Sequence, residues 1–135
     1  MTLTDAGALF ALIDKNQEAH ARCRAALRTL PKPLLTPWTC FTEAMYFAFK
    51  SGGLSRQRLL WGLVNDGLLK FHAPSEAEVE RMQTLMEEYH DTPMDMADAS
   101  LVAVAETLDV QRIFTLDSDF YVYQRHGNAP FEVIP

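Results

Sequence analysis

Short apolar runs alternate with longer amphipathic segments, and this alternation constrains the fold more than any other feature of the sequence. The short runs predict strands over 2–4, 33–36, 68–72, 112–115 and 131–135. The longer segments repeat with the period of a helix over 7–14, 16–30, 38–50, 55–66, 75–90 and 94–108. Strands that are joined by helical crossovers pair in parallel, and helices then cover both faces of their sheet. The sequence therefore predicts an α/β three-layer sandwich around a central, mainly parallel five-stranded sheet.

Composition limits the class of protein. A length of 135 residues predicts one domain over 1–135, and 48% hydrophobic with 22% charged residues is typical of a globular chain. No apolar segment approaches about 18 residues and no leader pattern opens the chain, so we expect a cytoplasmic protein without membrane contact. Cys23 and Cys40 are too few for a disulfide framework and predict reduced thiols. The net charge of -6 argues against long-range attraction to nucleic acid, unless bound divalent cations offset it.

The stretch 91-DTPMDMADASLVAVAE-106 places two acids at the opening of an otherwise apolar helix. Asp95 has a local explanation, since Thr92 is a suitable N-cap, Pro93 suits the first helical position, and Asp95 then completes a capping box. Asp98 lies past that capping range and inside the edge of the apolar stripe. An unpaired carboxylate there would cost several kcal/mol of desolvation, so Asp98 requires a nearby cation.

Further acids follow the predicted strands, at the edge where parallel sheets bind ligands. Asp5 follows the first strand, Asp117 and Asp119 follow the fourth, and Glu43 is the only acid in the apolar segment 38–49. Each has a local alternative, which is an N-cap for Asp5, the helix dipole for Glu43 and turn hydrogen bonds for the other two. Together with Asp98 they predict an oxygen-only site for Mg²⁺ or Mn²⁺, suited to metal-assisted attack by water on a phosphodiester.

Four motifs in this order resemble the PIN domain family, and within it the VapC-type toxins. They are 3-LTDAGALFALID-14, 36-TPWTCFTEAMY-46, 94-MDMADASLVAVAE-106 and 113-IFTLDSDF-120, which together cover nearly the whole chain. The resemblance implies a sheet order of 3-2-1-4-5 and a Mg²⁺- or Mn²⁺-dependent ribonuclease. It also implies frequent homodimers and, for toxins, inhibition by a cognate antitoxin protein. Ala6 departs from the Thr or Ser that often follows the first acid, which removes one hydroxyl contact.

This hypothesis gives each candidate residue a role. Four acids would be catalytic and would hold the metal directly or through water: Asp5, Glu43, Asp98 and Asp117. Asp95 and Asp119 would be outer metal ligands, and either Asp117 or Asp119 fits the fourth motif, with Asp117 nearer the strand end. Thr115 would support a carboxylate or the attacking water. The candidates for RNA contacts, each of which also reads as a solvated charge, are Lys50, Arg56, Arg58 and Arg125.

Two other classes of protein also place acids at the strand ends of an α/β sheet. A PIN-fold binding or scaffold module would keep the acids with little or no nuclease activity. A phosphoryl-transfer receiver would need an acidic pair after the first strand, where Asp5 stands alone. The aromatic side chains of segment 38–49, including Trp38, indicate core or dimer contact rather than a platform for bases, and Trp61 suggests a homodimer.

Overall fold

The computed structural model describes residues 1–135 and contains a five-stranded, fully parallel sheet in the order β3-β2-β1-β4-β7. Its strands are β1 (Thr2–Thr4), β2 (Leu34–Pro37), β3 (Leu69–His72), β4 (Arg112–Phe114) and β7 (Glu132–Ile134). Leu3 of the central strand β1 aligns with Leu35 on one side and with Ile113 on the other. Since β7 is the predicted fifth strand, the expected order 3-2-1-4-5 is confirmed.

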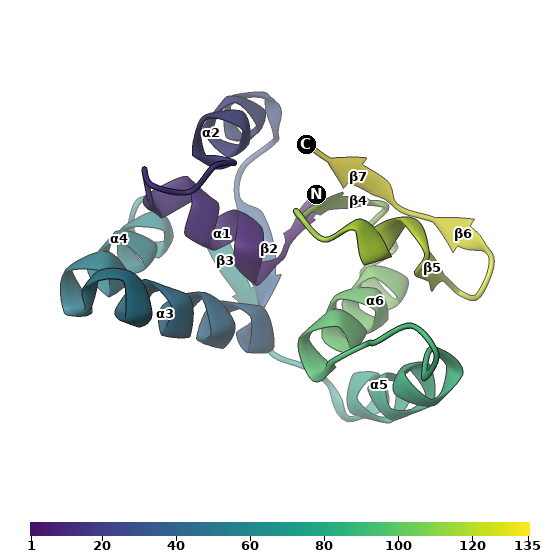
Figure 1. Cartoon of the computed structure of the whole chain (residues 1–135). Helices are drawn as coiled ribbons and strands as arrows, with labels where there is room; N and C mark the ends of the chain where they lie inside the picture. The colour runs from purple at the N-terminus through teal and green to yellow at the C-terminus, as the bar shows by residue number, and fades with distance from the viewer.

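Six α-helices cover the sheet, and Figure 1 shows α3 and α4 on one side of it and α5 and α6 on the other. They are α1 (Ala6–Ile13), α2 (His20–Thr29), α3 (Trp38–Gly52), α4 (Leu54–Asn65), α5 (Glu76–Glu88) and α6 (Met96–Leu108). The predicted three-layer α/β architecture is therefore confirmed. None of these helices combines the length and the apolar character that a bilayer crossing requires.

The core is built mainly from β1, α1 and α6. All three residues of β1 are buried, and every residue of α6 from Ala97 to Ala105 is buried as well. A helix that is apolar on all sides is stable only when other elements surround it, and α6 packs against α5, β2 and α3. Asp5 directly follows β1, and Asp98 lies in the first turn of α6. Because both elements are buried, the core fixes the positions of these two acids.

The start of α6 differs from the prediction, and this changes the role of its two acids. Residues 93–95 are not helical, α6 begins at Met96, and Asp95 is its N-cap. The backbone N–H of Asp98 donates to Asp95 Oδ1 at 2.8 Å, and that of Asp95 donates to Asp98 Oδ2 at 3.2 Å. Thr92 is thus not the N-cap. The expectation that Asp98 lies beyond the capping range is wrong, because Asp98 is the third helical residue of the box.

The C-terminal region contains elements that the hydrophobic pattern does not predict. A short 3₁₀ helix, η1 (Ser118–Tyr121), follows β4, and a two-stranded antiparallel hairpin joins β5 (Gln124–Arg125) to β6 (Ala129–Pro130). The hairpin strands have two residues each, too few to show an alternating pattern. Cys23 and Cys40 are buried and unpaired in α2 and α3.

Candidate metal centre

Asp5 projects from the carboxyl end of the central strand. It is the N-cap of α1, and its Oδ1 accepts from the backbone N–H of Ala6 at 2.7 Å. Its Oδ2 accepts from the Thr115 hydroxyl at 2.9 Å. The local capping role foreseen from the sequence is real, yet it uses one carboxylate oxygen only. The other oxygen is turned toward the segment that follows β4.

Thr115 links the acids of two neighbouring strands. Its hydroxyl donates to Asp5 and also accepts from the backbone N–H of Asp117 at 3.0 Å. Thr115 is buried, and its own backbone N–H donates to Ile134 O of β7 at 2.9 Å. Because one hydroxyl bridges both segments, Asp5 and Asp117 are held in a fixed relation to each other.

Three carboxylates meet at this edge of the sheet. Asp5, Asp98 and Asp117 each offer an oxygen atom, and these oxygens lie within 4.8 Å of one another. In Figure 1 the N-terminal ends of α1, α3 and α6 approach one another at this edge. No Lys, Arg or His forms an ion pair with any of the three acids. The protein brings negative charge together here and supplies no cation of its own.

The pKa values reflect this uncompensated charge. Burial, followed by the charge of Asp95, raises the pKa of Asp98 to about 8. Burial also raises the pKa of Asp5, against the lowering effect of the Thr115 and Ala6 hydrogen bonds. Both residues are only 9% exposed. A carboxyl group that resists ionisation in a buried, acid-rich site would be ionised readily if a cation were bound beside it.

The remaining predicted acids surround the three-carboxylate cluster without belonging to it. Glu43 lies on the second turn of α3, and burial together with the charges of Asp95 and Asp5 raises its pKa. Asp95 is exposed at the start of α6. Asp119 lies in η1, and its backbone N–H donates to Asp117 Oδ1 at 2.9 Å. Of the two acids of the fourth motif, Asp117 is therefore the one that joins the cluster.

The donor chemistry fits a hard divalent cation. Three carboxylate oxygens are available, and such oxygens suit Mg²⁺ or Mn²⁺. The nearest sulfur is Cys40 Sγ, 3.9 Å from Asp5 Oδ1. Burial, followed by the charges of Asp5 and Glu43, raises the pKa of the Cys40 thiol well above its ordinary value. Cys40 therefore stays protonated and does not offer the thiolate that softer metals prefer.

The predicted RNA-contacting residues lie in different environments. Lys50 is exposed near the end of α3 and lies over the Tyr46 ring, and Arg58 is exposed on α4. The guanidinium of Arg56 lies 3.8 Å from the Asp14 carboxylate. Arg125 is 8% exposed and contacts Asp109 Oδ1 and Pro130 O. Arg56 and Arg125 are thus engaged with the protein, whereas Lys50 and Arg58 face solvent.

Two hollows flank the cluster. The first has a volume of about 430 Å³ and lies between the starts of α3 and α6. Trp38, which the sequence placed in the core or a dimer contact, lines this hollow beside Glu43 and Asp95, with its ring stacked on Phe71 at 4.3 Å. The indole is 45% exposed. The sequence signal for this position was that Trp38 opens the segment that also bears Glu43.

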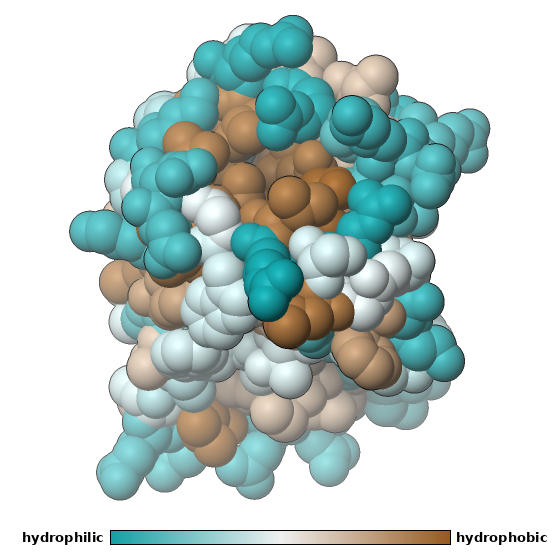
Figure 2. Space-filling view, turned by 90° about the vertical axis from the view of Figure 1, so that its left-hand side faces the viewer, coloured by the Kyte–Doolittle hydropathy of each residue, from teal (hydrophilic) through white to brown (hydrophobic).

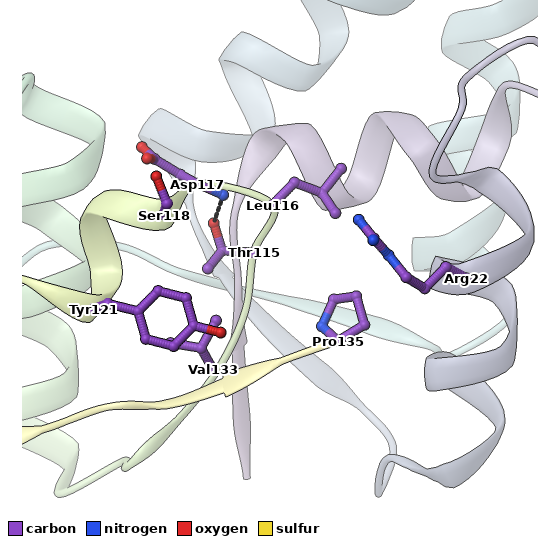
Figure 3. Close-up of a pocket in the computed structure, with 8 residues that line it drawn as sticks. All are labelled: Arg22, Thr115, Leu116, Asp117, Ser118, Tyr121, Val133 and Pro135. Atoms are coloured by element: carbon purple, nitrogen blue, oxygen red, sulfur yellow. Dashed lines mark hydrogen bonds between the residues drawn. The ribbon is translucent and has the colours of Figure 1, made fainter.

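The second hollow is a cleft of about 180 Å³ on the other side of Asp117. Figure 3 shows the residues of this Arg22 cleft, which are Arg22, Thr115, Leu116, Asp117, Ser118, Tyr121, Val133 and Pro135. The Arg22 side chain extends from α2 toward Leu116. No sequence pattern singles out Arg22, because α2 carries three exposed arginines and none follows a strand end.

Solved structures of toxins share this architecture. VapC20 of Mycobacterium tuberculosis, a toxin that cleaves the sarcin-ricin loop, matches with a TM-score of 0.87 over 100% of both chains, at 15% sequence identity. The chain has the PIN-domain fold of the VapC toxins. VapBC2 from Rickettsia felis, bound to a DNA fragment from its promoter, shares this PIN fold with a TM-score of 0.69 over 99% of this chain and 98% of that one, at 12% identity. A toxin-antitoxin complex from Klebsiella pneumoniae matches with a TM-score of 0.68 over 89% of this chain and 90% of that one, at 21% sequence identity.

These matches confirm the PIN-like fold that the four sequence motifs predict. The sequence alone matches no family model and no curated protein. The agreement therefore lies in the fold, with the candidate metal centre at the carboxyl edge of its sheet.

Proposed function

We propose that this chain is a divalent-metal-dependent endoribonuclease, a hydrolase that cleaves phosphodiester bonds of RNA with metal-activated water. The observation that carries the proposal is the meeting of Asp5, Asp98 and Asp117, from three separate segments, within 4.8 Å of one another. Carboxylates repel one another at such distances unless a cation lies between them. Their convergence on a PIN fold is what a metal-dependent nuclease requires.

The structure suggests which residues would hold Mg²⁺ or Mn²⁺. Asp5, Asp98 and Asp117 would be the direct ligands, and Glu43, Asp95 and Asp119 would act through water or orient the ligands. The cation would lower the pKa of the attacking water and stabilise charge on the leaving oxygen.

The chain's own contribution is to orient the acids. Thr115 fixes one oxygen of Asp5 and the position of Asp117, and the capping box fixes Asp98 at the start of α6. Such outer contacts keep ligands in place while the substrate enters.

The test is cleavage of RNA under metal control. A sarcin-ricin-type hairpin and an unstructured RNA are incubated with Mg²⁺, Mn²⁺ or EDTA and the parent chain, Asp98→Asn, or Asp66→Asn. Asp66 is the exposed C-cap of α4 and forms no ion pair, so Asp66→Asn is a matched control for the same chemical change. We expect cleavage by the parent and by Asp66→Asn, and none in EDTA or with Asp98→Asn. RNA that is bound but not cleaved under any metal condition would instead indicate a PIN-fold scaffold module.

The toxin-antitoxin assignment is a further part of the proposal. Two similar structures are described as a toxin-antitoxin complex and as VapBC2 with promoter DNA. We propose that residues 1–135 form one PIN-like toxin domain that acts in the cytoplasm and is inhibited by a cognate antitoxin. Expression of the chain alone should arrest growth, and co-expression with a small open reading frame that adjoins its gene should relieve this arrest.

Of the predicted RNA contacts, Lys50 and Arg58 are free to contact phosphate, whereas Arg56 and Arg125 would have to leave their present partners.

A homodimer is also part of the proposal. Figure 2 shows apolar residues gathered in a hollow on the side of α1 to α4. Exposed apolar side chains on α3 and α4 include Phe49, Leu54, Leu59 and Trp61, each more than 40% exposed. Contiguous apolar surface of this kind marks protein contacts. Sedimentation should give a dimer for the parent chain and a monomer for Leu54→Asp; a monomeric parent would contradict this part of the proposal.

A further inference from the structure

We infer that the Arg22 cleft is a binding subsite for a backbone phosphate of the RNA strand, next to the phosphate that is cleaved. The inference rests on the proposed function and deepens it, because it names a group that positions the substrate. Arg22 is not one of the residues that would hold the metal. It would bind the strand at a phosphate beyond the bond to be cleaved.

The cleft and the candidate metal centre share a wall. Thr115 and Asp117 line the cleft, and the same two residues form the Asp5–Thr115–Asp117 hydrogen-bond chain of the metal centre. In Figure 3 the carboxylate of Asp117 and the hydroxyl of Ser118 lie at one end of the cleft, and the Arg22 guanidinium reaches in from α2 at the other. A strand whose cleaved phosphate lies at the metal centre therefore continues directly into the cleft.

The cleft offers donors that have no partner in the protein. Arg22 makes no ion pair and no side-chain hydrogen bond, although 18 acids outnumber 12 basic residues in the chain. The Ser118 and Tyr121 hydroxyls form no hydrogen bond either, and the Tyr121 ring reaches into the cleft. A guanidinium presents a planar fork of N–H donors that matches two phosphate oxygens. The fork supplies the contact to the phosphate, and the two hydroxyls, on the other side of the cleft, are free to contact the strand nearer Asp117.

Of the two flanks of the cluster, the side of α2 carries the basic residues. Helix α2 carries Arg22, Arg24 and Arg28 and no acid. The opposite flank of the cluster, around the Trp38 hollow, carries Glu43 and Asp95. A phosphate chain that crosses the acidic centre is thus repelled on one flank and attracted on the other.

A phosphate fits the cleft better than the carboxylate of an acidic peptide does. Consecutive phosphates are tethered to the one at the metal centre, so the neighbouring phosphate is delivered to the cleft by the strand itself. The apolar side chains of Leu116 and Val133 line the same cleft and offer contact to the sugar between the two phosphates. A peptide carboxylate has no such tether beside Asp117.

The experiment compares Arg22→Ala with Arg24→Ala. Arg24 is exposed on the same helix, makes no ion pair and does not line the cleft, so it is a matched control for general charge. Two RNAs are used, one with natural phosphates and one with a neutral methylphosphonate at the phosphate that flanks the cleavage site. We expect Arg22→Ala to raise KM about tenfold and to reduce kcat less than twofold, because a charge-assisted contact at the surface is lost. Arg24→Ala should change KM less than twofold, and Arg22→Lys should recover part of the loss.

The methylphosphonate RNA decides whether the two groups meet. For the parent chain, this RNA should raise KM by about the factor that Arg22→Ala causes with natural RNA. For the Arg22→Ala chain, the methylphosphonate should raise KM no further. Equal losses in both chains, or no effect of Arg22→Ala on KM, would overturn the inference. An effect of Arg22→Ala on binding of an acidic peptide but not of RNA would also overturn it, in favour of a peptide site.

Binding keeps this test separate from the test of catalysis. Fluorescence anisotropy of the same RNAs on the Asp98→Asn chain, with and without Arg22→Ala, measures the subsite without turnover. A tenfold loss of affinity there supports the subsite even if the parent chain cleaves nothing, whereas an unchanged affinity overturns it even if the parent chain is an active nuclease.

Discussion

Asp98→Asn should make the metal-free protein more stable at alkaline pH. Asp98 is 9% exposed, lies within 4.8 Å of two other carboxylates and makes no ion pair. Its pKa rises from the ordinary 3.8 to about 8, first through burial and then through Asp95. One pKa unit corresponds to roughly 1.4 kcal/mol, so ionised Asp98 costs the fold at most about 6 kcal/mol above pH 8. Water that enters the open site lowers this figure, and we expect a gain of about 2 kcal/mol for Asp98→Asn.

The pH dependence gives the sign of the effect. A carboxyl whose folded pKa is raised binds its proton more tightly in the folded state, so the stability of the parent chain falls as pH rises from about 4 to about 8. Asn does not titrate, and its carbonyl can still accept from the Asp95 N–H. In EDTA at pH 8.5 we expect the melting temperature of Asp98→Asn to exceed that of the parent by about 6 °C. The difference should shrink at pH 5.

The control and the contradicting result follow from the same reasoning. Asp66→Asn, at the exposed C-cap of α4 and without an ion pair, should leave the melting temperature unchanged at both pH values. A loss of stability in Asp98→Asn at pH 8.5 would refute the reasoning, since it would mean that the carboxylate helps the metal-free fold.

Three further predictions concern separate contacts. Thr115→Val removes the hydroxyl that bridges Asp5 and Asp117, so kcat should fall about 10- to 100-fold at saturating Mn²⁺. A kcat within twofold of that of the parent would show that this contact does not contribute to catalysis. Although burial opposes it, hydrogen bonds from the backbone of Ser75 and from His72 lower the pKa of Glu78. Urea unfolding of Glu78→Gln should therefore show a loss of about 1–2 kcal/mol at pH 7 that fades below pH 4, where the parent's carboxylate is protonated. Addition of 1 mM Mn²⁺ should raise the melting temperature of the parent more at pH 8 than at pH 6, because the raised pKa values of the acids make protons compete with the ion; an equal rise at both values would count against this competition.

The layers could be predicted because they follow from local patterns, whereas the order of the sheet was implied by the resemblance to the PIN domain family. The run over 2–4 and the helical pattern over 94–108 identify a strand and an apolar helix without any knowledge of tertiary contacts. The gathering of Asp5, Asp98 and Asp117 also followed, because each comes at or near the end of an element that meets the carboxyl edge of the sheet.

The start of α6 could not be predicted from the same patterns. Pro93 is acceptable at a first helical position, so the sequence favours an earlier start. In the structure the Tyr123 hydroxyl donates to Pro93 O at 2.7 Å, a contact across 30 positions that keeps this segment outside the helix. Asp95 is then the N-cap and Asp98 its reciprocal partner in the capping box. Tertiary contacts therefore decide which of the two acids caps the helix.

The arginines show a second limit of the sequence. Arg125 follows the fourth motif and reads as a free cation, yet the hairpin of β5 and β6 buries it against Asp109 and Pro130. Arg22 reads as one of several surface charges on a helix. Only the packing of α2 beside the segment after β4 brings it to the cleft next to Asp117. The direction of a long side chain depends on neighbours that are distant in sequence.

The most direct test of the account is Mn²⁺ binding measured by electron paramagnetic resonance at pH 8. The account predicts a tight site in the parent chain that is weakened more than tenfold by Asp5→Asn, Asp98→Asn and Asp117→Asn, and much less by Asp119→Asn. Binding that persists unchanged in all three single variants would contradict the claim that these carboxylates converge in order to capture one divalent cation.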